Sequence, residues 1–325
     1  MKEQIRIGSR GSALALWQTR WVQQELAGRF KNVEIDVQII KTTGDKILDS
    51  PLSKIGDKGL FTREIEQALL ANEIDLAVHS LKDLPTELPT GLTIGAICRR
   101  EDVRDVFIPH PKNPVRTLFD QPKNARIATG SLRRKCQLLN HRPDFAIIDI
   151  RGNLNTRLQK LDNSDWAGMI LARAGVVRLG LEERIGETLS PETLLPAVGQ
   201  GALAVEIRAN DQRIDSFVSG LNHENTKHAA LAERALLRTL EGGCQVPIGT
   251  YGRIESTDNE ESLLLDAVVG SVDGRKVVRG RIHGSPGKAE HLGKELALIL
   301  LKGGADAILG EIRKQSGPVA EPAAV

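Results

Sequence analysis

Arginine recurs where predicted strands give way to helices, in turns that also carry small polar residues. The set comprises Arg10, Arg133, Arg134, Arg151, Arg157 and Arg178. Open α/β sheets bind ligands at the carboxyl ends of their strands, and guanidinium groups bind carboxylates through paired hydrogen bonds. A single arginine of this kind could simply decorate a solvated surface. The recurring set instead predicts a site for a ligand that carries several carboxylates or phosphates.

A charged pair also follows a predicted strand. Lys82 and Asp83 lie within the stretch HSLKDLP, just before a proline that stops regular structure. A carboxylate beside a lysine at a strand end can transfer protons or stabilise a cation. On an open surface the same pair would be an ion pair worth about 0–1 kcal/mol. This motif alone does not decide between the two interpretations.

Cys244 differs from the other two cysteines. It lies in the loop EGGCQVPIG, where glycines leave the sulfur accessible, and an accessible thiolate is a strong nucleophile. A free cysteine is more commonly a small buried hydrophobe, which fits Cys98 at the end of an apolar strand and Cys136 within an amphipathic helix. Three widely separated cysteines indicate reduced thiols in a cytoplasmic protein, not a disulfide framework.

Residues 42–59 form a long polar segment, TTGDKILDSPLSKIGDKG. A loop of this length inside a compact domain is usually functional or mobile. We interpret it either as a lid over an anionic ligand, with Lys54, Lys58 and the nearby Phe61 closing the site, or as a surface loop. Cysteine and histidine do not occur at zinc-binding spacing, so no metal site is predicted.

The elements that would position these residues alternate between strand and helix over the first two-thirds of the chain. Two such series imply two α/β units with largely parallel sheets. The first series has strands at 4–7, 33–39, 74–78 and 92–97, with helices after residues 12 and 60. After a proline-rich stretch, the second has strands at 125–129, 145–150 and 169–172, with helices at 132–140 and 154–161.

The pattern changes twice more along the chain. A break at 194–201 precedes a strand at 202–207 that could return to the first sheet. From residue 223 onward, helices and hairpin strands predict an α+β unit, and the proline- and alanine-rich tail is predicted to be disordered. The predicted domains are residues 1–98 with 202–219, residues 104–197 and residues 223–315, followed by the tail 316–325.

Composition excludes several functional classes. The 325 residues carry 44 Lys and Arg against 42 Asp and Glu, and 3% are aromatic. That balance argues against a nucleic-acid-binding protein, which needs a basic surface or a stacking platform. No apolar run approaches the roughly 20 residues that span a bilayer. The N-terminus MKEQIRIGSR lacks the apolar core of a secretory signal, so we expect a cytoplasmic protein that does not bind membranes.

These motifs together resemble the porphobilinogen deaminase family, whose members are also called hydroxymethylbilane synthases. The matching blocks run in the family's order over the whole chain except the tail. They are GSRGSALALWQ (8–18), KGLFTREIE (58–66), AVHSLKDLPTELP (77–89), TGSLRRKCQL (129–138), RGNLNTRLQKLD (151–162), LPAVGQGALAVEIR (195–208) and EGGCQVPIG (241–249).

The resemblance implies a fold, a reaction and a cofactor. The first two domains should resemble the halves of a periplasmic-binding-protein fold around a cleft, with a small third domain. The family condenses four porphobilinogen molecules head to tail, with loss of ammonia at each step, and water then releases hydroxymethylbilane. The chain grows on a dipyrromethane cofactor held through a thioether, which the motif match places on Cys244.

The resemblance also implies roles for individual residues. Asp83 and Lys82 would be catalytic, with Asp83 stabilising cations and moving protons, and the connections 98–105 and 194–201 would be hinges. The cofactor-binding set would be Cys244, Asp83, Lys82, Ser131, Arg133, Arg134, Arg151, Gly152 and Thr129. The substrate carboxylates would be bound by Arg10, Ser12, Arg151, Arg157 and Arg178.

One alternative function fits much of the pattern. Two α/β lobes around an anion-binding cleft also describe a non-enzymatic carboxylate receptor or an effector domain. Such a protein has no need of an accessible cysteine in GGCQVPIG. We therefore expect an enzyme that takes porphobilinogen as its partner and acts as a monomer.

Overall fold

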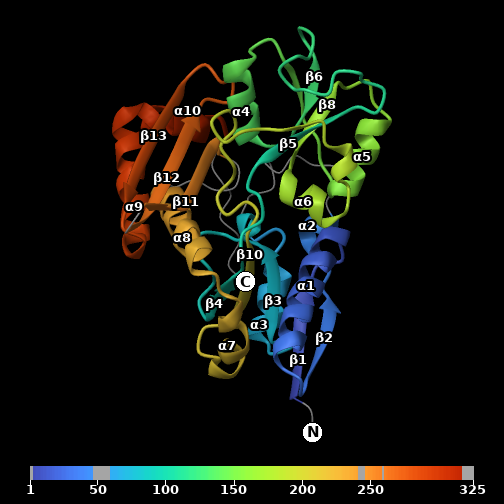
Figure 1. Ribbon diagram of the computed structural model, residues 1–325, viewed down its shortest axis with the longest axis vertical. Coiled ribbons are helices and arrows are strands. Elements are labelled where there is room, and N and C mark those ends of the chain that lie inside the picture. Colours follow the sequence, from blue (N-terminus) through green and yellow to red (C-terminus); the bar gives the residue numbers. More distant parts are fainter. Residues whose placement is uncertain (1–2, 47–58, 241–245, 258–259, 317–325) are drawn as a thin grey trace.

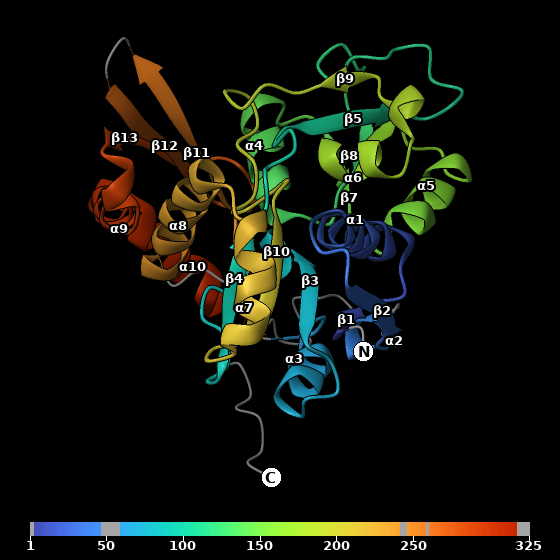
Figure 2. The same cartoon turned by 60° about the horizontal axis from the view of Figure 1, so that its bottom comes forward.

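The computed structural model describes residues 3–46, 59–240, 246–257 and 260–316. Its elements are arranged as two α/β units and a smaller C-terminal α+β unit, each built around its own sheet (Figures 1 and 2). The fold class predicted from the sequence, two α/β domains and a small C-terminal α+β domain, is confirmed.

The first unit contains a sheet in the order β2-β1-β3-β10-β4. Strand β10 is antiparallel to both its neighbours, whereas the other four run parallel. The strands are β1 (Glu3–Ser9), β2 (Val33–Ile39), β3 (Leu76–Ser80), β4 (Leu92–Ile97) and β10 (Leu203–Arg208). The helices are α1 (Ala13–Arg29), α2 (Thr43–Lys46), α3 (Arg63–Leu70) and α7 (Gln212–Val218).

The buried face of helix α1 combines apolar and polar residues. Val22 and Leu26 pack in the core, whereas the tryptophan Trp17 stays more than one-third exposed. Thr19 is also buried, because its hydroxyl donates to Ser9 Oγ at 2.7 Å. The core side of α1 is therefore set by its contacts with β1 as well as by apolar side chains.

The second unit repeats this design with a sheet in the order β7-β6-β8-β5-β9, in which β5 runs antiparallel to β8 and β9. The strands are β5 (Asp105–Pro109), β6 (Arg126–Ala128), β7 (Ala146–Ile148), β8 (Gly168–Ala172) and β9 (Glu187–Thr188). The helices are α4 (Leu132–His141), α5 (Leu154–Asp162) and α6 (Arg173–Arg178). Sequence reasoning missed β5, since its five residues end at Pro109 and merge into a proline-rich stretch.

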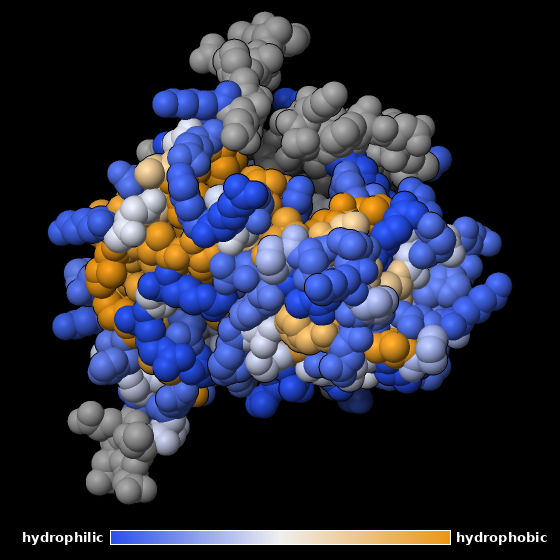
Figure 3. Space-filling model, turned by 90° about the horizontal axis from the view of Figure 1, so that it is seen from above, coloured by the Kyte–Doolittle hydropathy of each residue, from blue (hydrophilic) through white to orange (hydrophobic). Residues whose placement is uncertain are grey.

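The third unit is a three-stranded antiparallel sheet packed against helices. It consists of β11 (Ile248–Thr257), β12 (Glu260–Gly270), β13 (Val277–Gly284), α8 (Glu224–Thr239), α9 (Ala289–Leu300) and α10 (Asp306–Ser316). Strand β11 escaped the sequence analysis because glycines interrupt it. Gly252 is required there, since a Cβ would lie 3.0 Å from the carbonyl oxygen of Ala229 on α8. Apolar side chains gather over this unit in Figure 3.

Shorter helical segments complete the path of the chain. These are η2 (Leu81–Asp83), η3 (Glu182–Arg184), η4 (Ser219–Leu221), η5 (Pro286–Lys288) and the π-helical η6 (Leu301–Ala305). Of these, η2 matters most for function, because it carries the charged pair that follows β3.

All three units meet at one buried carboxylate. Glu233 on α8 is fully buried and accepts hydrogen bonds from Arg100 at 2.6 and 3.1 Å. It also accepts from the backbone N–H of Gly199 at 2.7 Å and of Gly252 at 2.8 Å. Arg100 and Gly199 belong to the two connections between the α/β units. The third unit is therefore tied to both connections at the same point.

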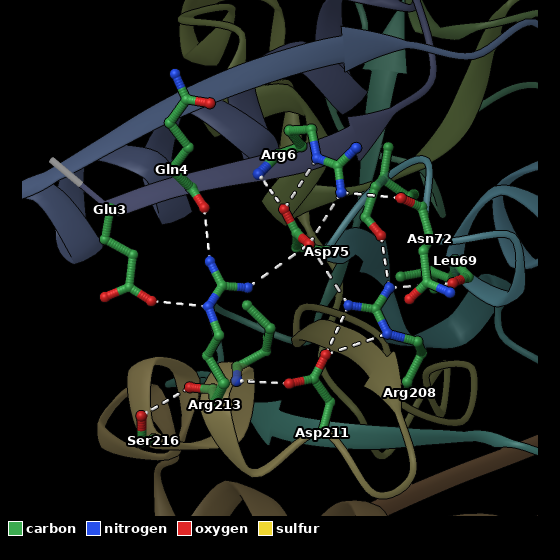
Figure 4. A network of polar contacts seen from close by, with 12 residues as sticks. Glu3, Gln4, Arg6, Leu69, Asn72, Asp75, Arg208, Asp211, Arg213 and Ser216 are labelled. Carbon is green, nitrogen blue, oxygen red and sulfur yellow. Dashed lines mark hydrogen bonds and ion pairs between the residues drawn. The ribbon is translucent and has the colours of Figure 1, made fainter. Parts of the chain in front are cut away.

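An ion-pair network in the first unit centres on Asp75, the residue just before β3 (Figure 4). Asp75 accepts from the Arg6 backbone N–H at 2.8 Å and from its guanidinium at 3.1 and 3.2 Å. Arg208 and Arg213 approach the same carboxylate at 3.5 and 3.8 Å. Burial alone would raise the pKa of Asp75, but the hydrogen bonds from Arg6 outweigh it and hold the pKa below its ordinary value.

We expect Asp75→Asn to destabilise the protein at neutral pH by about 1.5–3 kcal/mol, the usual range for hydrogen bonds to a charged group. Because the folded-state pKa is depressed, this stabilisation is present above the unfolded pKa of about 4 and is lost as pH falls. Urea unfolding at several pH values should show the variant and the parent converging in acid. Asp165→Asn removes an ion pair whose carboxylate is 73% exposed, and should change little at any pH. A loss in Asp75→Asn that persists unchanged in acid would contradict this assignment.

Candidate active site

The turn η2 places Lys82 and Asp83 at the carboxyl end of β3. Leu81 anchors it: its side chain is buried, and its backbone N–H donates to the carbonyl oxygen of Ala202 at 3.0 Å. Just before the turn, Ser80 Oγ accepts from Gln18 Nε2 on α1 at 2.8 Å. With its base fixed, the turn holds Lys82 half-buried and Asp83 exposed.

Helix N-termini lie at the carboxyl ends of strands in both α/β units. The side chain of Ser12 caps α1 by accepting from Ala15 N at 3.3 Å, and Ser131 caps α4 by accepting from Arg134 N at 3.4 Å. Asn153 caps α5 in the same way, at 2.9 Å from Thr156 N. Each serine hydroxyl keeps its own proton to donate, and helix N-termini attract anions.

The connection before α5 depends on one glycine. Gly152 has φ +118°, a backbone conformation that side chains rarely adopt, and a Cβ there would lie 2.8 Å from the Thr156 side chain. Its carbonyl oxygen accepts from Arg157 Nε at 2.8 Å, which fixes the direction of that guanidinium. Thr129 is buried at the end of β6, where its hydroxyl accepts from the backbone N–H of Ser131 at 3.3 Å.

Charged residues from both α/β units act on one another across the space between them. The charges of Arg133, Arg134 and Asp105 in the second unit shift the pKa of Lys82 in the first unit. In turn, the charge of Asp83 in the first unit acts to raise the pKa of Arg157 in the second unit. The positive groups in this cluster outnumber the negative ones by five to three. The cluster consists of Lys82, Arg133, Arg134, Arg151 and Arg157 with Asp83, Asp105 and Asp149.

The surplus of positive charge is visible in the protonation equilibria. Burial lowers the pKa of Arg157 to about 10, and the nearby Arg134 contributes to the shift. Burial also lowers the pKa of Lys82, with Arg134 and Arg133 acting in the same direction against the opposing effect of Asp83. A cluster of cations that suppress one another's charge is relieved when an anion binds among them.

Arg133 and Arg134 are more deeply buried than the sequence suggested. Both pair with Asp105, each through a 2.8 Å contact to a different carboxylate oxygen. They also donate to the carbonyl oxygens of Leu195 at 2.6 Å and Ile170 at 2.9 Å. Only their Nε donors lack a partner in the described part of the chain. Their predicted role as ligand contacts would therefore rest on few donors.

Sequence reasoning missed Asp105, the acid that fixes this pair. Arg133 and Arg134 hold its pKa well below the ordinary value against the opposing effect of burial. The available signal was an aspartate at the start of an otherwise apolar run, DVFIP, because a fully buried carboxylate requires a partner.

Two other predicted arginines lie on either side of the start of α1. Arg10 stacks on the Phe61 ring, with its guanidinium carbon 4.2 Å from the ring centre. Arg178 is buried, donates to the carbonyl oxygen of Gly201 at 2.7 Å and lies 5.6 Å from the Trp17 ring centre. Arg178 thus joins α6 to the connection that returns to β10.

Three predicted site residues, Cys244, Lys54 and Lys58, lie outside the described residues. Within the described ranges, no group of three His, Cys, Asp or Glu residues could hold a metal ion. The helices of the same part of the chain include none long and apolar enough to cross a membrane.

Comparison with known families decides between an enzyme and a receptor. Residues 5–216 match the model described as porphobilinogen deaminase, dipyromethane cofactor binding domain, and residues 227–302 match the porphobilinogen deaminase C-terminal domain. The chain belongs to the porphobilinogen deaminase family. Its function is that of this transferase family, also called hydroxymethylbilane synthase, and it uses a dipyrromethane cofactor.

Similar porphobilinogen deaminases come from the genus Chlorobium. That of Chlorobium phaeovibrioides (strain DSM 265 / 1930) is 55% identical over 97% of this chain and 99% of its own length. That of Chlorobium phaeobacteroides (strain DSM 266 / SMG 266 / 2430) is 54% identical with the same coverage. The resemblance to this deaminase family read from the motifs is confirmed.

Two solved structures are more distantly similar to the chain. The BenM effector binding domain with its effector benzoate is 14% identical, with a TM-score of 0.41, and the match covers 68% of this deaminase and 91% of that domain. The aliphatic sulphonate binding protein SsuA from Escherichia coli is 13% identical, with a TM-score of 0.39, covering 74% of this chain and 71% of that one.

The described residues fit a dipyrromethane. Such a group, built from two porphobilinogen units with an acetate and a propionate each, brings four carboxylates. The cluster offers surplus positive charge and the two buried Nε donors of Arg133 and Arg134 that lack a partner among the described residues. Each of these donors can form a charge-assisted hydrogen bond to a carboxylate oxygen.

Proposed function

We propose that Asp83 and Lys82 are the catalytic pair of this porphobilinogen deaminase. The main support is the position of Asp83 within a cluster of five cations. Asp83 is exposed and has no ion-pair partner in the described ranges. Asp105, by contrast, is fully committed to Arg133 and Arg134. Asp83 is therefore available to a substrate.

The reaction sets two tasks that a carboxylate at this position can perform. When porphobilinogen loses ammonia, its ring becomes a cation, and the bond to the next ring creates a second positive charge before a proton leaves. Asp83 would stabilise both charges by accepting hydrogen bonds from pyrrole N–H groups, and would take up the departing proton. Lys82 would bind a carboxylate of the incoming ring beside it.

The arginines would hold the carboxylates that every pyrrole ring brings. We propose that the cofactor is bound by Lys82, Asp83, Thr129, Ser131, Arg133, Arg134, Arg151 and Gly152, and the substrate by Arg10, Ser12, Arg151, Arg157 and Arg178. Support comes from the capped helix N-termini beside several of these residues and from the lowered pKa of Arg157. Lys54, Lys58 and Phe61 would close the site, and the stacking of Phe61 on Arg10 is consistent with this role.

Cys244 is the proposed attachment point. When bound, dipyrromethane supplies the primer to which new rings are added. The two other cysteines are poorly suited to hold it, because both are buried, and burial raises the pKa of the Cys98 and Cys136 thiols to about 12. A thiol with so high a pKa supplies almost no thiolate.

The proposed domains are residues 1–98 with 202–219, residues 104–197 and residues 223–315. The pairing of β10 with β3 and β4 supports the discontinuous first domain, and the hinges would be 98–105 and 194–201. We further propose a monomer that works in the cytoplasm, in keeping with two buried free thiols.

Intact mass measured under denaturing conditions tests the attachment. The parent protein should exceed its sequence mass by two porphobilinogen units less two ammonias, and peptide mapping should place the excess on Cys244. Cys244→Ser should lose it, whereas the matched Cys98→Ala should keep it. Parent protein of unmodified mass should gain the excess and release ammonia on incubation with porphobilinogen. A receptor would do neither, and that result would refute the proposal.

A further inference from the structure

A second group of buried ionisable residues lies in the first unit, outside the cation cluster. His79 on β3 and Glu206 on β10 are both buried, with Nε2 and Oε2 3.0 Å apart. Glu66 on α3, which packs over the same strands, is buried as well. None of the three has a task in the chemistry described above.

The two carboxylates are incompletely satisfied. Oε1 of Glu66 and Oε1 of Glu206 are buried without a hydrogen-bond partner in the part of the chain that the structure describes. The negative charge of Glu206 acts to raise the pKa of Glu66, whereas His79 and Arg63 act to lower it. With both carboxylates ionised, two negative charges would lie out of water beside His79, while Arg63 is exposed. This is a costly arrangement.

A proton on Glu66 resolves this conflict. Burial raises the pKa of Glu66 above its ordinary value, and the neighbouring Glu206 contributes in the same direction. A protonated carboxyl also gains a hydrogen-bond donor, which a carboxylate lacks.

The same residues support the base of the catalytic turn. His79 lies on β3 one residue before Ser80, where the strand ends and η2 begins. Two contacts join this end of β3 to β10. The first is between the side chains of His79 and Glu206. The second is the hydrogen bond from Leu81 N to the carbonyl oxygen of Ala202, the residue before β10. Movement of Glu206 relative to His79 would therefore shift the turn that carries Lys82 and Asp83.

We propose that Glu66, His79 and Glu206 form a proton-holding cluster that positions the catalytic turn, with Glu66 protonated in the active enzyme. The three act as positioning residues, since none reaches the cation cluster itself. The proposal rests on the proposed function, because it requires that turnover depend on Asp83. It makes turnover sensitive to a proton held behind the sheet, apart from the protons exchanged with substrate.

Glu66→Gln tests the idea because glutamine mimics the protonated carboxyl. The holoenzyme and the variant are compared for kcat with porphobilinogen and for thermal midpoint, between about pH 5 and about pH 9. A raised folded-state pKa gives stability that is present below the unfolded pKa and is lost as pH rises through the folded one. As pH rises, the thermal midpoint of the variant should therefore increase relative to that of the parent. The kcat of the parent relative to the variant should fall with rising pH, by about tenfold or more for loss of a positioning proton.

Two further variants make the result decisive. Glu73→Gln changes an exposed glutamate close by and should follow the parent at every pH. Glu206→Gln removes the other carboxylate, which helps to raise the pKa of Glu66, and should move the fall in kcat to lower pH, which keeps the test valid if Glu66→Gln does not fold. Profiles of kcat that stay parallel in all variants would overturn the proposal. An error in the role of Asp83 would show separately, as turnover retained in Asp83→Asn.

Discussion

Asp83→Asn should lower kcat by about 10²–10⁴-fold, the range for loss of a positioned acid–base group. The amide keeps the shape of the side chain but loses the negative charge that would stabilise the cationic rings. The fold should be unaffected, because Asp83 is exposed and makes no ion pair within the described residues. Steady-state kinetics with porphobilinogen, together with the thermal midpoint, separates these two effects.

The matched control is Asp149→Asn. Asp149 belongs to the same charge cluster and is also exposed, but it lies after β7 rather than in the turn η2. A general loss of negative charge would affect both variants equally, whereas the proposed chemistry affects only Asp83. Turnover near the parent value in Asp83→Asn would remove Asp83 from the mechanism.

Asp105→Asn should destabilise the protein by about 3–5 kcal/mol, the cost of breaking a buried ion pair by removing one partner. The substitution leaves two guanidinium groups, both more than nine-tenths buried, without their counter-charge. It should also disturb the cation cluster, since Arg133 and Arg134 would no longer be fixed. Urea unfolding followed by circular dichroism measures the loss.

An exposed ion pair in the same unit provides the comparison. Asp162 contacts Arg184 with 38% of its side chain accessible, so Asp162→Asn should change the free energy of unfolding little. If the two variants lost similar stability, the buried pairing of Asp105 would be structurally unimportant, and Arg133 and Arg134 would be held by their backbone contacts alone.

The order of the elements was predictable because the hydrophobic period switches clearly between strand and helix. Residues 33–39 alternate perfectly and form β2 over the same range. The helix predicted at 132–140 is α4, capped by Ser131 as its sequence position suggests. The motifs with fixed spacing around Lys82, Arg133 and Arg151 were sufficient to indicate the family.

Packing between distant segments was not predictable. The core face of α1 includes Thr19 because of a hydroxyl on β1, and Trp17 instead faces Arg178 of the other unit. Likewise, spacing along the chain could not show that Arg133 and Arg134 share one buried aspartate. These features depend on which elements meet in three dimensions, and that information is spread over the whole sequence.

The place of β10 has a consequence for how the protein is made. This strand lies between β3 and β4, although it follows the entire second unit in the sequence. A nascent chain therefore leaves the ribosome with the second unit complete while β3 and β4 still lack their common partner. Unpaired strand edges are prone to aggregation. The middle of the chain should thus fold before its beginning, and the first unit should need protection until Arg208 has emerged.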